Sequence, residues 1–386
     1  MDVSRLREQI PACLAMTYLN TGWSGPSPLS VVSAIKERLD LEMLQGPTSP
    51  EVSQSGREIH AEAREAVARL VNATADEICL TKNTTEGLNM VMNGLAWRQG
   101  DEIITCDLEH SSVLIPSYFQ QRRHGAAVKV LPVAPDETRE KILEKIEEAI
   151  SERTRLVFLS HVEYSSGLRM PVKEIRELTR DRDVMLLLDG AQTAGQVALD
   201  MADMDCDFYS IPVQKWLLGP EGAGALYIRR DRIPQVEPTH VGGRAVVSNE
   251  DPYRFEPDPT TMDKFLLAST SAPLQAGTVA AINFIQGIGV DKIEERNLDL
   301  AGAMKKALGE TPGVKVLSPL DRDSSSGLVS FAIDGVEPEV AVSRLWEEHR
   351  ILVRPVSFPP GIRISLHFFN TEEEVEQAAE VVRALA

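Results

Sequence analysis

The chain has 386 residues, of which 43% are hydrophobic, and its formal net charge at pH 7 is -18. This length allows two domains with substantial cores, and the apolar content excludes the disordered and fibrous classes. The negative charge argues against partners that are bound through phosphate backbones or anionic lipid surfaces, so we expect neither nucleic acid nor a membrane as a partner.

The cysteines and the first residues indicate the compartment. The four cysteines are widely spaced and form no Cys-x-x-Cys pair, which is typical of reduced thiols rather than of disulfides or a zinc site. The opening "MDVSRLREQIPACLAM" mixes both charges and lacks an apolar signal core, and no later segment approaches the length of a membrane span. We therefore expect a cytoplasmic protein without a metal site.

From about residue 60 onward, short apolar segments alternate with amphipathic helical patterns such as "DETREKILEKIEEAISE". The segments that we expect to be strands are "EICLT", "DEIITCDL", "AAVKVLPV", "RLVFLSHV", "VMLLLDGA", "DFYSI" and "GALYIRR". This alternation predicts a doubly wound α/β domain with a mostly parallel sheet, whose strand carboxyl ends carry the functional site.

After about residue 275 the pattern changes to a long helix, "PLQAGTVAAINFIQGIG", followed by shorter strands such as "GLVSFAI" and "GIRISLHFF". The last helix opens at Thr371, and Glu374 lies at the spacing of a capping box. We expect a smaller α+β domain here. The predicted organisation is an N-terminal arm that packs on the small domain, a large domain and a small domain, at residues 1–18, 19–275 and 276–386.

Lys215 lies between the strand "DFYSI" and a glycine-rich turn that precedes the strand "GALYI". A lysine at such a junction is partly buried, so it loses hydration and its pKa falls. Its neutral amine can then attack a carbonyl group. The alternative is a structural lysine whose ammonium group extends into water.

Two further polar sites fall at predicted strand ends. Thr84 and Thr85 follow "CLTKN" and open a helix, where they either bind a phosphate group or only cap the helix. Asp189 ends the apolar run "VMLLLD", where an unpaired carboxylate is unfavourable, so we expect a cationic or hydrogen-bonding partner. A phosphate site, a buried carboxylate and a reactive lysine together match the needs of pyridoxal phosphate.

From "YLNTGWSGPSP" to "IRISLHFFNTEEEVE", nearly its whole length, the sequence resembles the class V aminotransferase and cysteine desulfurase family of fold-type I pyridoxal phosphate enzymes. The resemblance implies that Lys215 in "QKWLLGPEGAG" is the cofactor lysine and that Asp189 in "DGAQ" pairs with the pyridine nitrogen. It also implies that Gln192 bonds the phenolic oxygen of the ring and that His110 in "LEHSS" stacks on the ring and takes part in catalysis.

The resemblance extends to the phosphate and the substrate. Thr84 and Thr85 in "NTTEG" match the phosphate turn. Thr270 in "LASTSAP" matches a residue that reaches the phosphate of the neighbouring subunit, which implies a homodimer with shared active sites. Arg363 in "IRISLHFFNTEEE" matches the arginine that binds the α-carboxylate of an amino-acid substrate through two hydrogen bonds. At the mouth of the pocket we expect Trp23, Ser24, Tyr164, His240 and Arg244. Of these, Trp23 and Tyr164 are predicted to bind substrate.

The sequence departs from the family pattern beside the lysine. Cysteine desulfurases commonly carry Ser-Gly-His before the lysine, whereas this chain has Pro212, Val213 and Gln214. Gln214 can donate a neutral hydrogen bond to the cofactor, but Pro212 has no donor, so binding of the phosphate depends more on the threonines. Tyr164 in "SHVEYSSG" replaces the asparagine of the family's "HVSN".

A larger departure concerns sulfur chemistry. Desulfurases use a cysteine on a loop before the carboxylate arginine, and the corresponding stretch here, "VRPVSFPPGIR", contains no cysteine. The sequence looks most like the branch with cystine C-S lyases and isopenicillin N epimerase-like proteins. We therefore expect β-elimination on a cysteine-type or cystine-type substrate, with Lys215 removing the α-proton. The alternatives are a class V aminotransferase that moves an amino group to a 2-oxo acid, a racemase or epimerase, a cysteine desulfurase, and a binding module without activity.

Overall fold

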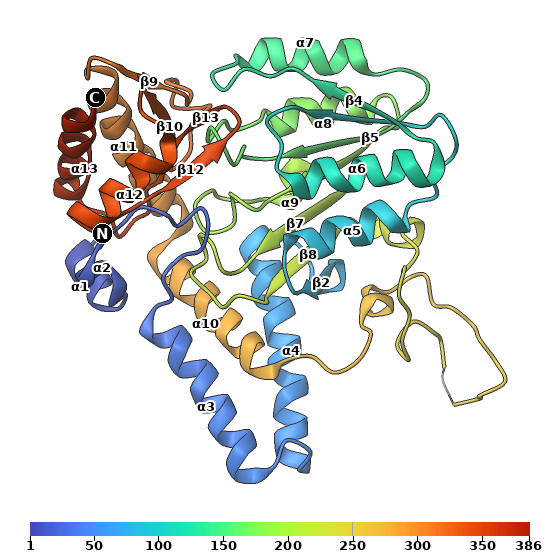
Figure 1. Ribbon diagram of the computed structural model, residues 1–386. Coiled ribbons are helices and arrows are strands. Elements are labelled where there is room, and N and C mark those ends of the chain that lie inside the picture. The colour runs from blue at the N-terminus through green and yellow to red at the C-terminus, as the bar shows by residue number, and fades with distance from the viewer. Residues whose placement is uncertain (249) are drawn as a thin grey trace.

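A seven-stranded sheet forms the centre of the larger of two lobes in the computed structural model, which describes residues 1–248 and 250–386 (Figure 1). In order across the sheet, the strands are β2 (Ile78–Thr81), β8 (Gly224–Ile228), β7 (Phe208–Pro212), β6 (Met185–Asp189), β5 (Thr154–Ser160), β3 (Glu102–Cys106) and β4 (Ala127–Leu131). β8 runs antiparallel to both of its neighbours, and the other adjacent pairs are parallel. The mostly parallel sheet predicted from seven apolar segments is confirmed.

Helices cover both faces of this sheet. Neighbouring strand residues such as Leu187 and Leu188 belong to different apolar clusters, because successive side chains point to opposite faces. One face packs against α5 (Thr84–Gly94) and α6 (Ser111–His124). The other packs against α4 (Pro50–Val71), α7 (Arg139–Ala149), α8 (Val172–Arg180), α9 (Met201–Met204) and α10 (Ala272–Ile288). Burial on both faces explains the nearly continuous apolar runs of the strands.

The smaller lobe is built on an antiparallel sheet with the strand order β12 (Arg354–Ser357), β13 (Pro360–Ser365), β10 (Leu328–Ile333) and β9 (Val314–Val316). Its helices are α11 (Val290–Gly309), α12 (Pro338–His349) and α13 (Glu372–Leu385). The predicted capping box opens α13, since Thr371 accepts the Glu374 N–H and the Glu374 carboxylate accepts the Thr371 N–H.

The N-terminal residues lie against this smaller lobe. They form α1 (Val3–Glu8), α2 (Ala12–Ala15) and β1 (Thr17–Tyr18), and β1 pairs in parallel with β11 (Ile351–Leu352). The guanidinium group of Arg7 forms an ion pair of 2.8 Å with Glu374 of α13. The long helix α10 runs through the expected domain boundary at residues 275 and 276, and its buried side chains join the core of the larger lobe.

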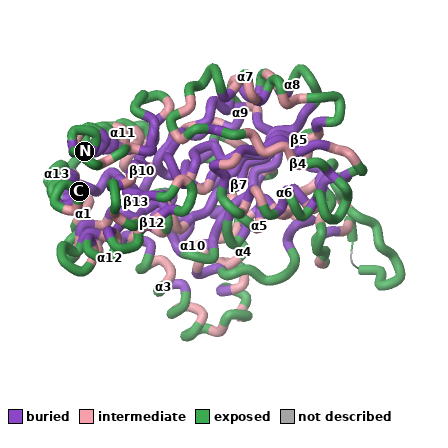
Figure 2. The backbone as a smooth tube through the Cα atoms, turned by 45° about the horizontal axis from the view of Figure 1, so that its top comes forward, coloured by how far each residue is buried: buried purple, intermediate pink, exposed green. Residues whose placement is uncertain are grey.

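Buried residues concentrate in the strands, whereas the outer parts of the helices are exposed (Figure 2). α3 (Leu29–Gln45) packs on α4 and α10 below the sheet and projects away from the two lobes (Figure 1). Short 3₁₀ helices lie in the described connections, at Ala75–Glu77, Arg230–Gln235 and Met262–Phe265. Within the described residues, no helix combines the length and the hydropathy that crossing a bilayer requires.

Candidate active site

A cavity of about 250 Å³ lies at the carboxyl ends of β5, β6 and β7, where the larger lobe meets β12 and β13. This volume is several times the roughly 30 Å³ that a water molecule occupies in the liquid, so the cavity admits a small ligand. The residues that sequence analysis singled out and that line the cavity are Trp23, Thr84, Thr85, His110, Tyr164, Asp189, Gln192, Gln214, Lys215 and Arg363. Ten residues dispersed over most of the chain thus meet in one pocket.

Lys215 lies in the connection between β7 and β8, as predicted from its flanking segments. Burial lowers the pKa of its ammonium group to about 8, although the nearby carboxylate of Asp189 opposes this shift. The N-terminal segment supports this connection, because the Gly25 N–H donates to the carbonyl oxygen of Gln214 over 2.7 Å. The amine is therefore easily deprotonated compared with an exposed lysine.

Asp189 is the last residue of β6 and is buried. One carboxylate oxygen, Oδ1, accepts the N–H of Ala191 over 2.8 Å. Within the described residues, the other oxygen accepts no hydrogen bond, although Asp189 lines the pocket. Burial raises the pKa of Asp189, whereas the charge of Lys215 opposes the increase. The site therefore offers one free carboxylate oxygen to a cationic or N–H group of a ligand.

The amino end of α5 faces the pocket. Asn83 caps this helix by accepting the Glu86 N–H over 2.9 Å, and the helix begins at Thr84, as predicted. The hydroxyl groups of Thr85 and Ser112 lie 2.8 Å apart at the same edge. Free N–H groups and the positive end of the helix dipole favour an anion at this place.

His110 and Tyr164 form an aromatic pair in the pocket, with ring centroids 5.1 Å apart and an edge-to-face angle of 84°. Nδ1 of His110 accepts the Ser112 N–H over 3.1 Å, which leaves Nε2 as the nitrogen that can carry the proton. Partial burial and the charge of Lys215 lower the pKa of His110 to about 4. The imidazole is therefore neutral at physiological pH.

Two arginines enter the pocket from the smaller lobe. Arg363 on β13 and Arg354 on β12 are partners in the register of the sheet. Arg363 is fully buried and donates to the carbonyl oxygen of Tyr164 over 2.8 Å, but its Nε and Nη2 atoms have no hydrogen-bond partner. The guanidinium of Arg354 lies 4.4 Å from the ring centroid of Trp23. Burial and the charge of Arg354 lower the pKa of Arg363 to about 9.

Within the described residues, neither arginine forms an ion pair with a carboxylate. Because unpaired buried charges are unfavourable, the pocket favours an anionic ligand. Sequence analysis missed Arg354. Its signal was the short hairpin "RPVSFPPGIR", which places the arginines at the two ends of the segment on adjacent strands.

The two glutamines differ in their bonding. The amide of Gln192 donates to the carbonyl oxygen of Gly22 over 2.9 Å and accepts the indole N–H of Trp216 over 2.8 Å, so its orientation is fixed. The side-chain oxygen of Gln214 is buried and has no hydrogen-bond partner. A ligand in the cavity can supply the donor that this oxygen lacks.

Other predicted site residues lie outside the pocket of this chain. Thr270 is exposed in the segment before α10. His240 is also exposed, and Arg244 pairs with Asp263 over 3.6 Å. The Ser24 hydroxyl group lies near the rim but does not line the cavity. All four cysteines are unpaired and buried, and none of them lines the pocket.

Known proteins match this chain over nearly its full length. A family model described as aminotransferase class V matches residues 17–378. The chain belongs to the class V aminotransferase family. It is therefore a pyridoxal phosphate-dependent enzyme, like the members of this family.

Curated relatives of this class V enzyme have different activities. It is 31% identical over 404 residues to a probable cysteine desulfurase of Methanothermobacter thermautotrophicus, a match that covers 100% of this chain and 98% of the relative. It is also 31% identical over 388 residues to isopenicillin N epimerase of Streptomyces clavuligerus, with 95% and 94% covered. The family is thus established, whereas the reaction differs among relatives of equal similarity.

Solved structures confirm the fold. The cystine C-S lyase C-DES in complex with its reaction product cysteine persulfide superposes with a TM-score of 0.91 at 29% identity, covering 97% of this chain and 99% of the other. The cysteine desulfurase CsdA from Escherichia coli gives a TM-score of 0.89 at 26% identity, with 100% and 98% covered. A C-DES mutant that carries glycine linked to its PLP cofactor gives 0.92 at 29% identity. The predicted fold-type I architecture is confirmed.

Proposed function

We propose that Lys215 forms the covalent link to pyridoxal phosphate and that Asp189 pairs with its ring nitrogen. Three features of the pocket fit this group. The amino end of α5, with Thr84 and Thr85, suits the phosphate. Asp189 has a free carboxylate oxygen, and the lowered pKa of Lys215 leaves an amine that reacts with an aldehyde. The charges and donors present thus match those of the cofactor.

The remaining pocket residues complete this assignment. His110 would lie on the face of the cofactor ring, and its neutral imidazole adds no charge there. Gln192, whose orientation is fixed by Trp216, would donate its remaining amide hydrogen to the phenolic oxygen. Gln214 lines the pocket, and its side-chain N–H would donate to the phosphate. With these roles, each of the three residues would contact a different part of the cofactor.

We further propose that the reaction is β-elimination from a cysteine-type or cystine-type amino acid. Pyridoxal phosphate supplies an electron-withdrawing ring that stabilises negative charge at the α-carbon. Arg363 would hold the α-carboxylate, and the Lys215 amine would take the α-proton. The sulfur group leaves the β-carbon with the electron pair of the broken bond, and the resulting enamine takes up water to give pyruvate and ammonia.

The absence of a thiol from the described pocket carries this proposal. All four cysteines are buried elsewhere, and burial raises the pKa of Cys13, Cys79 and Cys106, which disfavours thiolate formation. Without a thiolate at the pocket, the chain has no acceptor for a persulfide, so the sulfur must leave on a small molecule. The second arginine, Arg354, adds a site for another carboxylate, which a cystine-type substrate carries.

The deciding experiment supplies cystine, cysteine and other amino acids to the purified enzyme, with and without a 2-oxo acid. We expect continuous release of pyruvate and ammonia from a sulfur-bearing substrate without any 2-oxo acid. A transaminase would instead stop after one half-reaction and resume when the acceptor is added. If turnover occurs only when a 2-oxo acid is present, the enzyme is an aminotransferase and the proposed elimination is wrong.

Two variants sharpen this test. A cysteine-free chain that includes Cys106→Ser should retain turnover and lose only about 1–3 kcal/mol of stability from the altered core. Arg354→Met should raise the KM for cystine by about tenfold or more, because a charge-assisted hydrogen bond is lost, and should change the KM for cysteine less. Loss of activity in a folded cysteine-free enzyme would instead support a cysteine desulfurase that holds a persulfide on one of its own cysteines.

We also propose that the enzyme is a homodimer with shared active sites. α3 exposes Leu39, Met43 and Leu44, and Tyr253 and Phe255 are also exposed, so apolar surface is available for a second copy. Thr270, which does not reach the pocket of its own chain, is exposed.

Complementation between variants tests the shared sites. Mixing Lys215→Ala chains with Thr270→Ala chains, followed by unfolding and refolding together, should give more activity than either variant alone. Hybrid dimers contain one site in which both residues are native. Full activity in a monomeric fraction, identified by sedimentation, would contradict the proposal.

A further inference from the structure

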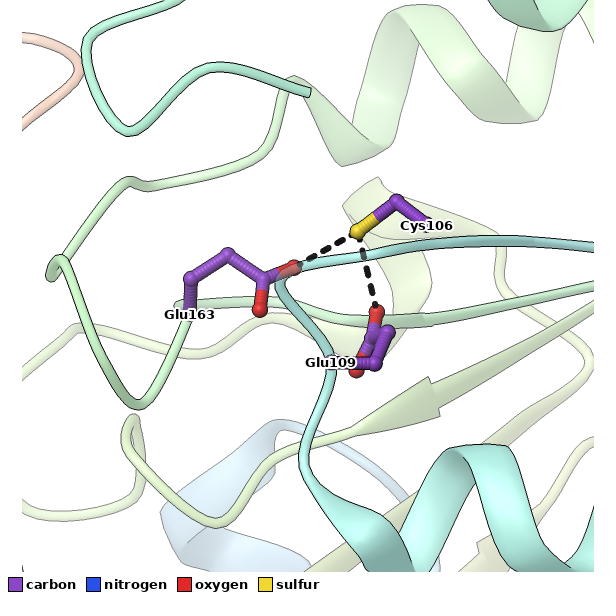
Figure 3. Close-up of side chains that lie close together, drawn as sticks. All are labelled: Cys106, Glu109 and Glu163. Atoms are coloured by element: carbon purple, nitrogen blue, oxygen red, sulfur yellow. Dashed lines mark hydrogen bonds between the residues drawn. The ribbon is translucent and has the colours of Figure 1, made fainter. Parts of the chain in front are cut away.

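Next to Ser160, which lines the pocket, three acidic side chains meet in the interior (Figure 3). Cys106 ends β3, Glu109 lies just before α6, and Glu163 follows β5. All three are buried, and their sulfur and oxygen atoms lie within 4.8 Å of one another. The thiol of Cys106 donates to Glu163 Oε1 over 3.4 Å and lies 3.8 Å from Glu109 Oε1.

These carboxyl groups lack a positive partner. Within the described residues, neither Glu109 nor Glu163 forms an ion pair, and the main influences on their pKa values include no lysine, arginine or histidine. Glu102, a buried carboxylate at the other end of β3, instead pairs with Lys129 at 2.7 Å and Arg153 at 2.8 Å. Ionising both of two adjacent buried carboxyl groups without a nearby cation would require a large free energy. The cluster must therefore hold a proton or a cation.

The hydrogen bonds distinguish the two carboxyl groups. Glu109 accepts the N–H and the Oγ–H of Ser160, each over 2.6 Å, which stabilises its ionised form. Glu163 receives only the weak thiol donor, and its Oε2 atom has no partner. Burial raises the pKa of both groups, and the negative charge of Asp189 raises both further. Glu163 is therefore the member that carries the proton, with Glu109 as the acceptor.

The position of this pair connects it to the pocket. Glu109 immediately precedes His110, and Glu163 immediately precedes Tyr164, whose rings meet in the cavity. We propose that Glu109 and Glu163 share one proton and that this bond ties together the two loops that carry His110 and Tyr164. Both glutamates are then positioning residues. Loss of the proton would place two negative charges side by side and drive the loops apart.

A bound cation is the competing explanation, because a thiolate and two carboxylates can ligate zinc. Both oxygens of Glu109 already accept hydrogen bonds from Ser160, whereas a metal would compete for one of them. A shared proton needs no such rearrangement and no additional partner. The titratable groups that act on the pair include Cys106 on β3, Asp189 on β6 and the phenol of Tyr164, and all three are acidic.

The substitution Glu163→Gln tests the proposal through stability, because its amide mimics the protonated carboxyl group permanently. Glu163 keeps its proton in the folded enzyme at pH values where an unfolded glutamic acid, with a pKa of about 4.3, has lost it. The wild-type enzyme should therefore lose stability as pH rises above about 5, whereas the variant should lose less. The Tm of the variant relative to the wild type should increase as pH rises above about 5, and should level off once the folded pair ionises.

Glu102→Gln is the matched control on β3. Burial opposes ionisation of Glu102, but hydrogen bonds from Lys129, Ser151 and Arg153 outweigh it and lower its pKa to about 2. Glu102 is thus ionised above pH 5 in both the folded and the unfolded chain. This variant should show a Tm offset that does not vary over the same pH range. Parallel Tm curves for Glu163→Gln and the wild type would overturn the proposal.

The positioning role has a separate readout in the ring resonances of His110, which can be assigned among seven histidines. Because its pKa is about 4, His110 itself does not titrate above pH 6. Its resonances should shift in the wild type as the pair ionises, and Glu163→Gln should remove that part of the shift. The part due to Lys215 should remain in both proteins. Glu163→Ala should displace the resonances at every pH.

Metal analysis of the purified holoenzyme separates the proton from a cation. We expect no stoichiometric metal in the wild type, and no change of Tm after treatment with a chelator. One equivalent of a transition metal that disappears in Glu163→Gln would overturn the proposal in favour of a metal site.

Discussion

Replacing Lys215 by alanine is expected to abolish turnover, with kcat reduced by about a thousandfold or more, because the chain loses both its nucleophile and the base for the α-proton. Borohydride reduction of the wild type should attach the cofactor irreversibly to the peptide that contains residue 215. The same treatment of the variant should leave no covalent adduct. Mass spectrometry of the digested protein measures both outcomes.

Lys264 provides a matched control for this result. It is also buried, and burial lowers its pKa to about 8, but its ammonium group donates to the carbonyl oxygens of Ile233 and Pro259. Lys264→Met should lose some stability and keep the covalent link at residue 215. A reduced adduct that persists in Lys215→Ala, or that disappears in Lys264→Met, would remove Lys215 from its assigned role.

The second large effect is expected from Asp189→Asn. The amide has nearly the same shape but no negative charge, so it no longer favours a protonated ring nitrogen. We expect kcat to fall by about 100- to 1000-fold, the range for the loss of one preorganised electrostatic contact. The cofactor content per subunit should stay close to that of the wild type, since the lysine and the phosphate contacts remain.

The conservative variant Asp189→Glu restores the charge and should recover more activity than the asparagine variant, although its carboxylate is displaced by one methylene group. Measured kcat and cofactor content for all three proteins test this order. Wild-type turnover in Asp189→Asn would mean that another residue meets the ring nitrogen.

Sequence reasoning predicted the larger lobe well because its signals are local. Each strand of the sheet is a short apolar run between helical patterns, and burial on both faces leaves little ambiguity. The positions of Lys215 and Asp189 follow from equally local signals, since Asp189 ends an apolar strand and Lys215 lies shortly after one. The capping box of Thr371 and Glu374 is likewise a four-residue pattern.

The features that sequence reasoning missed depend on contacts between distant segments. Arg354 becomes part of the pocket only through its register with Arg363 on the neighbouring strand. Glu109 and Glu163 are each adjacent to a residue that the sequence analysis singled out, but the two glutamates are 54 positions apart in the sequence. No local pattern shows that such segments meet, because the meeting follows from the order of the strands in the sheet.

The origin of the pocket residues has a consequence for how a substrate is held. Lys215 and Asp189 belong to the larger lobe, whereas Arg354 and Arg363 belong to the smaller one. An amino acid whose carboxylate binds the arginines while its α-carbon lies at the lysine spans the seam between the lobes. Ligand binding is therefore also a cross-link within the protein, and its free energy adds to the cohesion of the two lobes.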